Sequence, residues 1–208
     1  MTDHPLPEEM QRQELPADRQ AGGRERLLHT AYGLFRDHGF TAVGVDRIAD
    51  EAGVAKTTLY HHFASKDELG VAVLGQHQQL WTHDWLAAEA DRRKTPSVPA
   101  IIGLFDALDE WYRSDDYRGC LFINTVLELR DRTGPVREAA VDAMDDVHAT
   151  LEGLAEEAGI ADASTFAHQI QLLMRGSIVA AVEGHFEAVA QARVVARMLL
   201  EQHERESS

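Results

Sequence analysis

Apolar residues recur at intervals of three and four along most of the chain, and no long stretch alternates with a period of two. The first pattern places apolar side chains on one face of an α-helix, whereas the second is typical of strands. The pattern therefore predicts an all-α protein. The predicted helices cover approximately residues 24–38, 45–52, 55–62, 65–94, 101–112, 120–130, 135–158, 164–183 and 186–203.

Glycines and capping residues support several of the predicted helix ends. Gly39 and Gly53 follow the first and second helices, where glycine readily adopts the backbone conformation that ends a helix. Gly44 can serve as the N-cap of the second helix. Ser65 and Glu68 have the spacing of a capping box, which predicts the start of a long fourth helix.

The eighth predicted helix is apolar over much of its circumference, because Ile178, Val179 and Val182 alternate with small residues. A helix with one solvent-exposed side does not require such a composition. Burial against a second subunit explains it. From the last two helices the sequence predicts a dimer interface comprising Leu173, Ser177, Ala180, Ala181, Val195 and Leu199.

The N-terminal segment and the cysteine count restrict the class of protein. Residues 1–20 contain three prolines and five acidic residues without an apolar stretch, so we expect a disordered tail and no signal peptide. No later segment has the roughly 18 apolar residues that a membrane helix needs. Cys120 is the only cysteine, which excludes a disulfide framework within one chain. We expect a cytoplasmic protein that does not associate with membranes and needs no cofactor.

The net charge of −15 is unevenly distributed along the 208 residues. Residues 1–20 carry two basic and five acidic side chains, residues 21–75 carry six and seven, and residues 76–208 carry twelve and twenty-three. The segment from Gly53 to Lys66 contains no carboxylate. A contact with DNA depends on the local sign of the charge, so the acidic total does not exclude nucleic-acid binding.

The segment from Val45 to Phe63, VDRIADEAGVAKTTLYHHF, has the spacing of a helix-turn-helix. Ala49 is small where two helices cross, and Gly53 permits the tight turn between them. The second helix of such a motif presents its N-terminal part to the bases and phosphates of DNA. The alternative is a helix pair that binds protein, with Tyr60 in its core.

The sequence LLHTAYGLFRDHGF, followed by GVDRIADEAGVAKTTLYHHFASKDEL, closely resembles the DNA-binding domain of the TetR family over residues 26–69. Two positions depart from the family pattern: Gly44 replaces the usual Ser or Thr, and Thr57 replaces a frequent glycine. The resemblance implies that Lys66 binds a phosphate and that the other DNA contacts come from the two helices of the motif. The DNA-contacting residues predicted in this way are Gly44, Val45, Lys56, Thr57, Thr58, Tyr60, His62 and Lys66.

The resemblance also implies a nine-helix architecture, with a three-helix DNA-binding domain over residues 21–68 and a helical effector-binding and dimerisation domain over residues 69–208. The family pattern implies a homodimer that pairs its eighth and ninth helices as a four-helix bundle and reads a palindromic operator. The predicted function is a repressor that a small apolar or aromatic effector releases from DNA. The alternative is a DNA-bound helical dimer controlled by a protein partner or a metal.

Aromatic residues fall on the helices that surround the ligand cavity in similar proteins. Core packing explains these side chains as well as a ligand does, because apolar stripes are what folding alone demands. Asn124 and Glu128 lie one helical turn apart and can orient a ligand, although Glu128 can equally be solvated. The predicted pocket comprises Trp81, Trp85, Phe105, Trp111, Tyr112, Phe122 and Asn124.

Two features of the sequence are candidates for a catalytic or metal site. Cys120 lies beside Leu121 and Phe122, as a small buried residue does, and the sequence indicates no base or oxyanion donor for it. Asp145 and His148 supply one carboxylate-x-x-His pair, whereas a ferritin-like metal site needs two such pairs and further carboxylates. We predict no catalytic residue and no metal ligand, although the eleven histidines leave an unrecognised metal site open.

Overall fold

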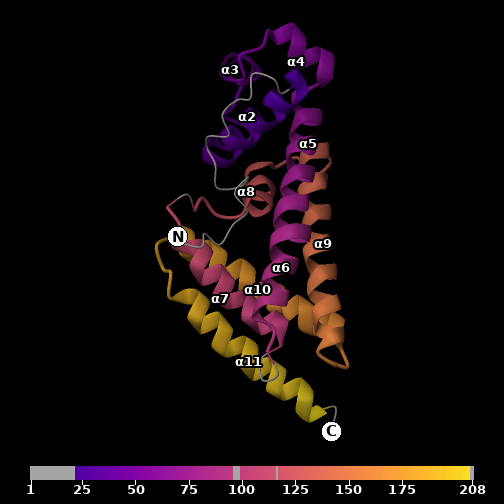
Figure 1. The fold of residues 1–208 in the computed structure, drawn as a ribbon, viewed down its shortest axis with the longest axis vertical. Helices are drawn as coiled ribbons and strands as arrows, with labels where there is room; N and C mark the ends of the chain where they lie inside the picture. Colours follow the sequence, from indigo (N-terminus) through magenta and orange to yellow (C-terminus); the bar gives the residue numbers. More distant parts are fainter. Residues whose placement is uncertain (1–21, 96–98, 116, 207–208) are drawn as a thin grey trace. The chain divides into compact units, whose positions relative to one another are not determined.

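The computed structural model describes residues 22–95, 99–115 and 117–206, and every regular element within these ranges is helical. The predicted N-terminal tail lies outside them. The all-α prediction is confirmed, and the helices follow the predicted order (Figure 1). They are α2 (Gly23–His38), α3 (Val45–Glu51), α4 (Lys56–His62), α5 (Lys66–Gln78), η1 (Gln79–Leu86), α6 (Ala87–Arg93), α7 (Ala100–Tyr112), α8 (Leu121–Glu128), α9 (Pro135–Glu157), α10 (Ala163–Val182) and α11 (Ala188–Glu206).

The described residues form two compact units. The first contains residues 22–79 and 120–143, and the second contains residues 80–95, 99–115, 117–119 and 144–206. The sequence-based division after residue 68 differs from this packing, because α8 and the first turns of α9 belong with the helix-turn-helix. Contacts between residues far apart in the chain decide this grouping, and local periodicity carries no information about them.

The first unit is built around the buried face of α2 and the helix-turn-helix that follows it. Leu27 and Ala31 on α2 are fully buried, as are Ile48 on α3 and Leu59 on α4. Helix α2 contacts α3, α4 and α5, and α5 contacts α8. The fold of this unit therefore rests on the apolar stripe that the sequence pattern places on each helix.

The second unit contains η1, α6, α7, α10, α11 and the rest of α9. Helices α7, α10 and α11 pack side by side (Figure 1). Helix α7 is buried around most of its circumference, because its neighbours α6, α10 and α11 cover different sides of it. Gly103 permits the close approach of α6, since a Cβ atom there would lie 2.7 Å from Cβ of Arg93.

The predicted continuous helix over residues 65–94 contains a π-helical segment, η1, between α5 and α6. A π-turn holds more residues per turn than an α-turn, so it rotates the side chains that follow it. Leu80, Trp81, Thr82, Trp85 and Leu86 are all buried in η1, which is more than one face of an α-helix would bury. The intervals of three and four between apolar residues do not reveal such a segment, because it depends on tertiary packing.

Candidate nucleic-acid interface and sensing region

The helix-turn-helix has the predicted geometry. Gly53 adopts a positive φ of 64° between α3 and α4, and the amide of Val54 donates to the carbonyl of Ala49. Gly44 precedes α3 with an extended backbone and offers no side-chain cap to the helix. The turn therefore depends on glycine where the backbone requires it, and no side chain caps the first turn of α3.

Helix α4 exposes the predicted DNA-contacting side chains. Lys56, Thr57 and Tyr60 are exposed, and Tyr60 retains 47% of its accessible surface. Thr58 and His62 are partly exposed, whereas Leu59 is fully buried. The alternative in which Tyr60 belongs to a core does not fit this exposure.

Lys56 is engaged by a carboxylate in the free protein. Its ammonium group lies 2.6 Å from Oδ1 of Asp46 on α3, and both side chains are exposed. The hydrogen bond to Asp46 raises the pKa of Lys56 above its usual value. A phosphate that binds Lys56 must therefore compete with Asp46.

Asp46→Asn is expected to strengthen DNA binding, by roughly threefold to tenfold at 0.1 M salt, because it releases Lys56 and removes a negative charge beside α4. Fluorescence anisotropy with a selected DNA site measures the change. The control is Asp91→Asn, an exposed substitution on α6 in the other unit. Unchanged affinity of the Asp46 variant would contradict a role for Lys56 at the phosphates.

Lys66 is the first residue of α5. The capping box is confirmed: the amide of Glu68 donates to Oγ of Ser65 at 3.0 Å, and the amide of Ala64 donates to the Glu68 carboxylate at 2.6 Å. The Lys66 ammonium lies 4.2 Å from the centre of the Phe40 ring. Burial lowers the pKa of Lys66, and the carboxylates of Glu128 and Asp67 act against this shift. The capping box thus positions a charged amine at a helix start, where phosphates are favoured.

Glu128 on α8 holds the turn between α2 and α3. Its carboxylate accepts hydrogen bonds from the amides of Phe40 at 2.9 Å and Thr41 at 2.6 Å. The close approach requires Gly39, which has a φ of 81° and no Cβ to meet the carboxylate. The sequence analysis considered Glu128 as a ligand-orienting or a solvated side chain. In the structure its carboxylate binds two backbone amides and fixes a turn of the first unit.

A buried polar contact inside the first unit was not predicted. The Tyr32 hydroxyl lies 2.9 Å from Nδ1 of His77, and the His77 ring packs edge-on against Phe122. Burial lowers the pKa of His77 to about 3, so the imidazole is neutral at physiological pH. Its Nε2 atom has no hydrogen-bond partner. The position of His77 four residues after the buried Val73 was the available signal in the sequence.

Three tryptophans form an aromatic cluster in the second unit. Ring centres lie 5.5 Å apart for Trp81 and Trp85, 5.9 Å for Trp81 and Trp111, and 6.1 Å for Trp85 and Trp111. Tyr112 and Tyr117 extend the cluster, and the sequence analysis missed Tyr117. The structure thus brings four of the predicted pocket residues together as packed, buried rings.

Two buried polar atoms on η1 lie in this part of the second unit. The indole Nε1 of Trp81 and the hydroxyl of Thr82 are buried without a hydrogen-bond partner. Tyr112 differs, since its hydroxyl lies 2.8 Å from Oγ of Ser177. An unpaired buried donor carries a desolvation cost of about 1–3 kcal/mol, which an acceptor on a ligand would remove.

The remaining predicted pocket residues lie elsewhere. Phe105 lines a groove between α7 and α11. Phe122 packs against His77 in the first unit. Asn124 on α8 is exposed.

The predicted dimer residues divide by burial. Ser177 and Ala181 are buried within the protomer, and Ser177 also donates to the carbonyl of Met174. Leu173, Ala180 and Leu199 are partly exposed, and Val195 is 42% exposed. The exposed large apolar side chains of α10 and α11 are Leu172, Val179, Val182, Val194, Val195 and Met198.

The sequence also singled out Cys120 and the pair of Asp145 and His148 as candidates for catalytic or metal chemistry. Cys120 is buried. His148 packs against His168 and lies 3.5 Å from Glu152 rather than joining the aspartates of α9. Within residues 22–95, 99–115 and 117–206, no three His, Cys, Asp or Glu side chains gather as metal ligands do, and no helix is long and apolar enough to cross a membrane.

One unit exposes α4, the second helix of a helix-turn-helix, and the other unit is helical with an aromatic interior. These features are typical of helical DNA-binding regulators. Comparison with known families agrees: "Bacterial regulatory proteins, tetR family" matches residues 27–73, and "Tetracyclin repressor-like, C-terminal domain" matches residues 97–196. The chain belongs to the TetR family. Its members are transcriptional regulators and not enzymes.

Individual relatives support this assignment. The chain is 35% identical to the HTH-type transcriptional activator FasR of Mycolicibacterium smegmatis over 67% of this chain and 64% of FasR. It is 29% identical to the repressor NemR of Escherichia coli over 56% of this chain and 58% of NemR. The solved structure of SCO4454, a TetR-family regulator from Streptomyces coelicolor, has a TM-score of 0.68 at 28% identity, covering 84% of this chain and 95% of that one. The matches span somewhat less than two thirds of the length of FasR and of NemR.

Proposed function

We propose that the chain is a homodimeric DNA-binding transcriptional repressor, which a small apolar or aromatic effector releases from a palindromic operator. The observation that carries the proposal is α4, whose outer side chains are exposed while Leu59 anchors the helix in the core. Lysine, threonine, tyrosine and histidine can all hydrogen-bond to phosphates or base edges. Two copies related by a two-fold axis would read half-sites about 34–36 Å apart.

The aromatic cluster is the proposed effector site. Flat apolar molecules bind among aromatic side chains that offer a few polar groups, and the cluster supplies an unpaired donor at Trp81. The rings are packed in this conformation, so an effector must displace part of the packing. Its binding energy is thereby coupled to a change in conformation, as a ligand-controlled switch requires.

Two helical segments can carry that change along the chain. The continuous run of α5, η1 and α6 begins in the first unit and ends in the second, and α9 also contributes residues to both. A ligand that binds one arrangement of η1 more tightly would change the population of the DNA-binding conformation. The size of this change is limited by the difference between the ligand's affinities for the DNA-binding conformation and for the released one.

Selection of DNA sites from a random library tests the DNA-binding part of the proposal. The expected result is a palindrome with half-sites one helical turn apart, bound by a dimer. A reporter gene under the selected site then gives the sign of regulation, which differs between FasR and NemR. Recovery of no enriched sequence would overturn the proposed function.

Intrinsic fluorescence tests the effector site, because the three tryptophans of the chain are all in the cluster. An effector found by thermal-shift screening should change the emission and weaken binding to the selected DNA. Trp81→Phe keeps an aromatic ring but removes the indole N–H, so effectors that accept a hydrogen bond should bind it about tenfold more weakly. An effector that releases DNA without altering emission or responding to this substitution would place the site elsewhere.

A further inference from the structure

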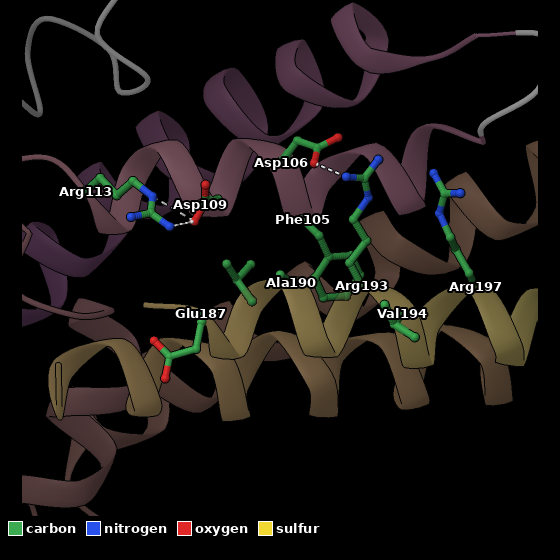
Figure 2. A pocket seen from close by; sticks show the side chains of 10 residues that line it. Phe105, Asp106, Asp109, Arg113, Glu187, Ala190, Arg193, Val194 and Arg197 are labelled. Atoms are coloured by element: carbon green, nitrogen blue, oxygen red, sulfur yellow. Dashed lines mark hydrogen bonds and ion pairs between the residues drawn. The ribbon is translucent and has the colours of Figure 1, made fainter. Parts of the chain in front are cut away.

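A groove of about 550 Å³ runs between α7 and α11 within the second unit (Figure 2). Its volume lies in the range of small-molecule sites, which is roughly 300–1,000 Å³. Apolar side chains form part of its lining. They are the buried Phe105 and Val189 and the exposed Ala190 and Val194. The groove therefore offers a surface for the apolar body of a small molecule.

Two arginines of α11 lie at one end of the groove (Figure 2). Arg193 and Arg197 are four residues apart, so they lie on the same flank of the helix. Arg193 binds Asp106 of α7 at 2.6 Å, but its Nε atom is buried without a hydrogen-bond partner. Arg197 is exposed and has no ion-pair or hydrogen-bond partner among the described residues. Two guanidinium groups against one carboxylate leave one positive charge in excess at this end.

The opposite end of the groove has the opposite balance of charge (Figure 2). Arg113 lines this end and binds Asp109 at 2.8 Å. Glu187 lies there too and interacts electrostatically with Arg113. Two carboxylates against one guanidinium leave one negative charge in excess. A ligand with an anionic group at each of its ends is therefore disfavoured.

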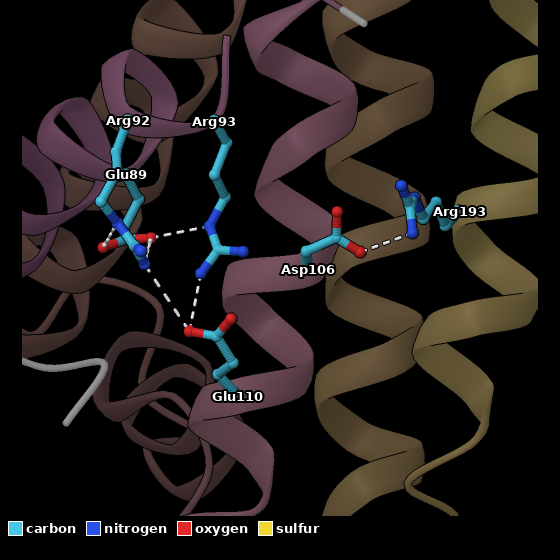
Figure 3. Close-up of polar contacts among 6 residues, drawn as sticks. All are labelled: Glu89, Arg92, Arg93, Asp106, Glu110 and Arg193. Atoms are coloured by element: carbon cyan, nitrogen blue, oxygen red, sulfur yellow. Dashed lines mark hydrogen bonds and ion pairs between the residues drawn. The ribbon is translucent and has the colours of Figure 1, made fainter. Parts of the chain in front are cut away.

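The wall formed by α7 is held on both sides (Figure 3). On one side Glu110 of α7 lies 2.7 Å from Arg93 of α6, and Glu89 also binds Arg93 at 2.8 Å. On the other side Asp106 binds Arg193 of α11. Because these ion pairs hold α7 between α6 and α11, the groove is formed before a ligand binds, and little free energy is lost in ordering it.

The two arginines lie on a different flank of α11 from Val195 and Leu199, the residues of this helix that the sequence predicts at the dimer interface. An α-helix turns by about 100° per residue, so each of these apolar residues lies at least about 120° away from both arginines. A homodimer built on Val195 and Leu199 would thus leave the arginines accessible to a ligand.

We propose that this groove is a second small-molecule site, separate from the aromatic cluster, and that it binds a monocarboxylate with an apolar body. The carboxylate accepts hydrogen bonds from Arg197 and from Nε of Arg193, because guanidinium groups match the geometry of carboxylates. The apolar body lies along Phe105 and Val194. A single negative charge balances the positive end, whereas a phosphate dianion would place excess negative charge beside Asp106. The proposal goes beyond the effector site of the proposed function and does not depend on it.

Calorimetric titration of the full chain with three matched ligands tests the chemistry of the site. Octanoate carries one carboxylate on an apolar chain, suberate carries a second carboxylate at its far end, and octanamide carries none. Octanoate should bind about tenfold more tightly than octanamide, because the amide lacks the charge-assisted hydrogen bonds. It should bind about fivefold more tightly than suberate, whose second carboxylate meets the negative end of the groove. A salt concentration of 0.5 M should reduce both differences.

Two substitutions test the positive end. Arg197→Ala should weaken octanoate binding about tenfold, because it removes a guanidinium that has no partner in the free protein. Asp106→Asn should strengthen octanoate binding about threefold, because it removes the carboxylate that competes for Arg193. The control is Arg132→Ala, which removes an exposed arginine of the first unit that does not line the groove. This variant should bind octanoate like the wild type.

Arg197→Lys keeps the positive charge and should bind octanoate within about threefold of the wild type, whereas a folding defect would affect both variants and appear in circular dichroism. Absence of octanoate binding, equal binding of suberate, or wild-type affinity of Arg197→Ala would each overturn the groove as a carboxylate site. None of these titrations involves DNA, so the selection of DNA sites decides the proposed function separately.

Discussion

Lys66→Ala should weaken binding to the selected DNA site roughly a hundredfold at 0.1 M salt, because each lysine that neutralises one phosphate contributes about tenfold and a dimer presents two. The capping box of Ser65 and Glu68 positions Lys66 at the start of α5, and the Phe40 ring packs against its ammonium group. The slope of log affinity against log salt concentration should fall by about two. Anisotropy titrations at several salt concentrations measure both quantities.

The chain offers a matched control, since it contains only three lysines. Lys94→Ala removes a comparable charge from an exposed side chain that pairs with Glu157 in the second unit. We expect no change of salt slope for this variant. Lys66→Arg keeps the charge and should retain most of the affinity. An unchanged slope for Lys66→Ala would show that this lysine meets no phosphate, and the groups that bind DNA would then be confined to α3 and α4.

Gly39→Ala should destabilise the protein by at least about 1–3 kcal/mol, which is the usual cost of forcing a residue with a side chain into a backbone region reserved for glycine. Gly39 has a φ of 81° and a ψ of 161° at the end of α2. A Cβ atom there would also lie 2.9 Å from Oε2 of Glu128. Because the turn connects α2 to α3, DNA binding should fall together with stability. Urea unfolding and anisotropy measure the two effects.

Gly75→Ala provides the control for this prediction. Gly75 lies inside α5, and no atom would come within 4 Å of an added Cβ. The substitution should be neutral or stabilise the protein by about 0.5–1 kcal/mol, because alanine favours helices more than glycine does. Gly39→Ala combined with Glu128→Ala relieves the contact but not the backbone strain, so it should remain less stable than Glu128→Ala alone. Wild-type stability of Gly39→Ala would refute the strain argument.

Features that depend on neighbouring residues in the chain were predictable. The helix-turn-helix, the glycine turn at Gly53 and the capping box of Ser65 all rest on contacts within a few residues, so spacing and residue type suffice to predict them. The same holds for the exposure of α4, because Leu59 is the apolar position of a short amphipathic helix. Which of its side chains touch DNA stays a prediction.

The proposed effector-binding unit was less predictable for a physical reason. Aromatic spacing indicated buried rings, but it did not distinguish Phe105 beside α11 from Trp111 in the tryptophan cluster, because both lie on the buried α7. The π-helical turn of η1 and the unpaired Trp81 donor arise from packing against helices distant in sequence. Periodicity describes one helix at a time, so it carries no information about contacts between helices that are distant in sequence.

The sequence by itself determined the helical class, the order of the helices and the DNA-reading segment, because each of these follows from local periodicity, turns and caps. Only the tertiary structure decided that α8 packs with the DNA-binding unit and that Glu128 binds the amides of Phe40 and Thr41. It also decided that Phe105 lines a groove beside α11 rather than joining the tryptophan cluster. These features join residues up to 88 positions apart, and their partners are chosen by three-dimensional packing.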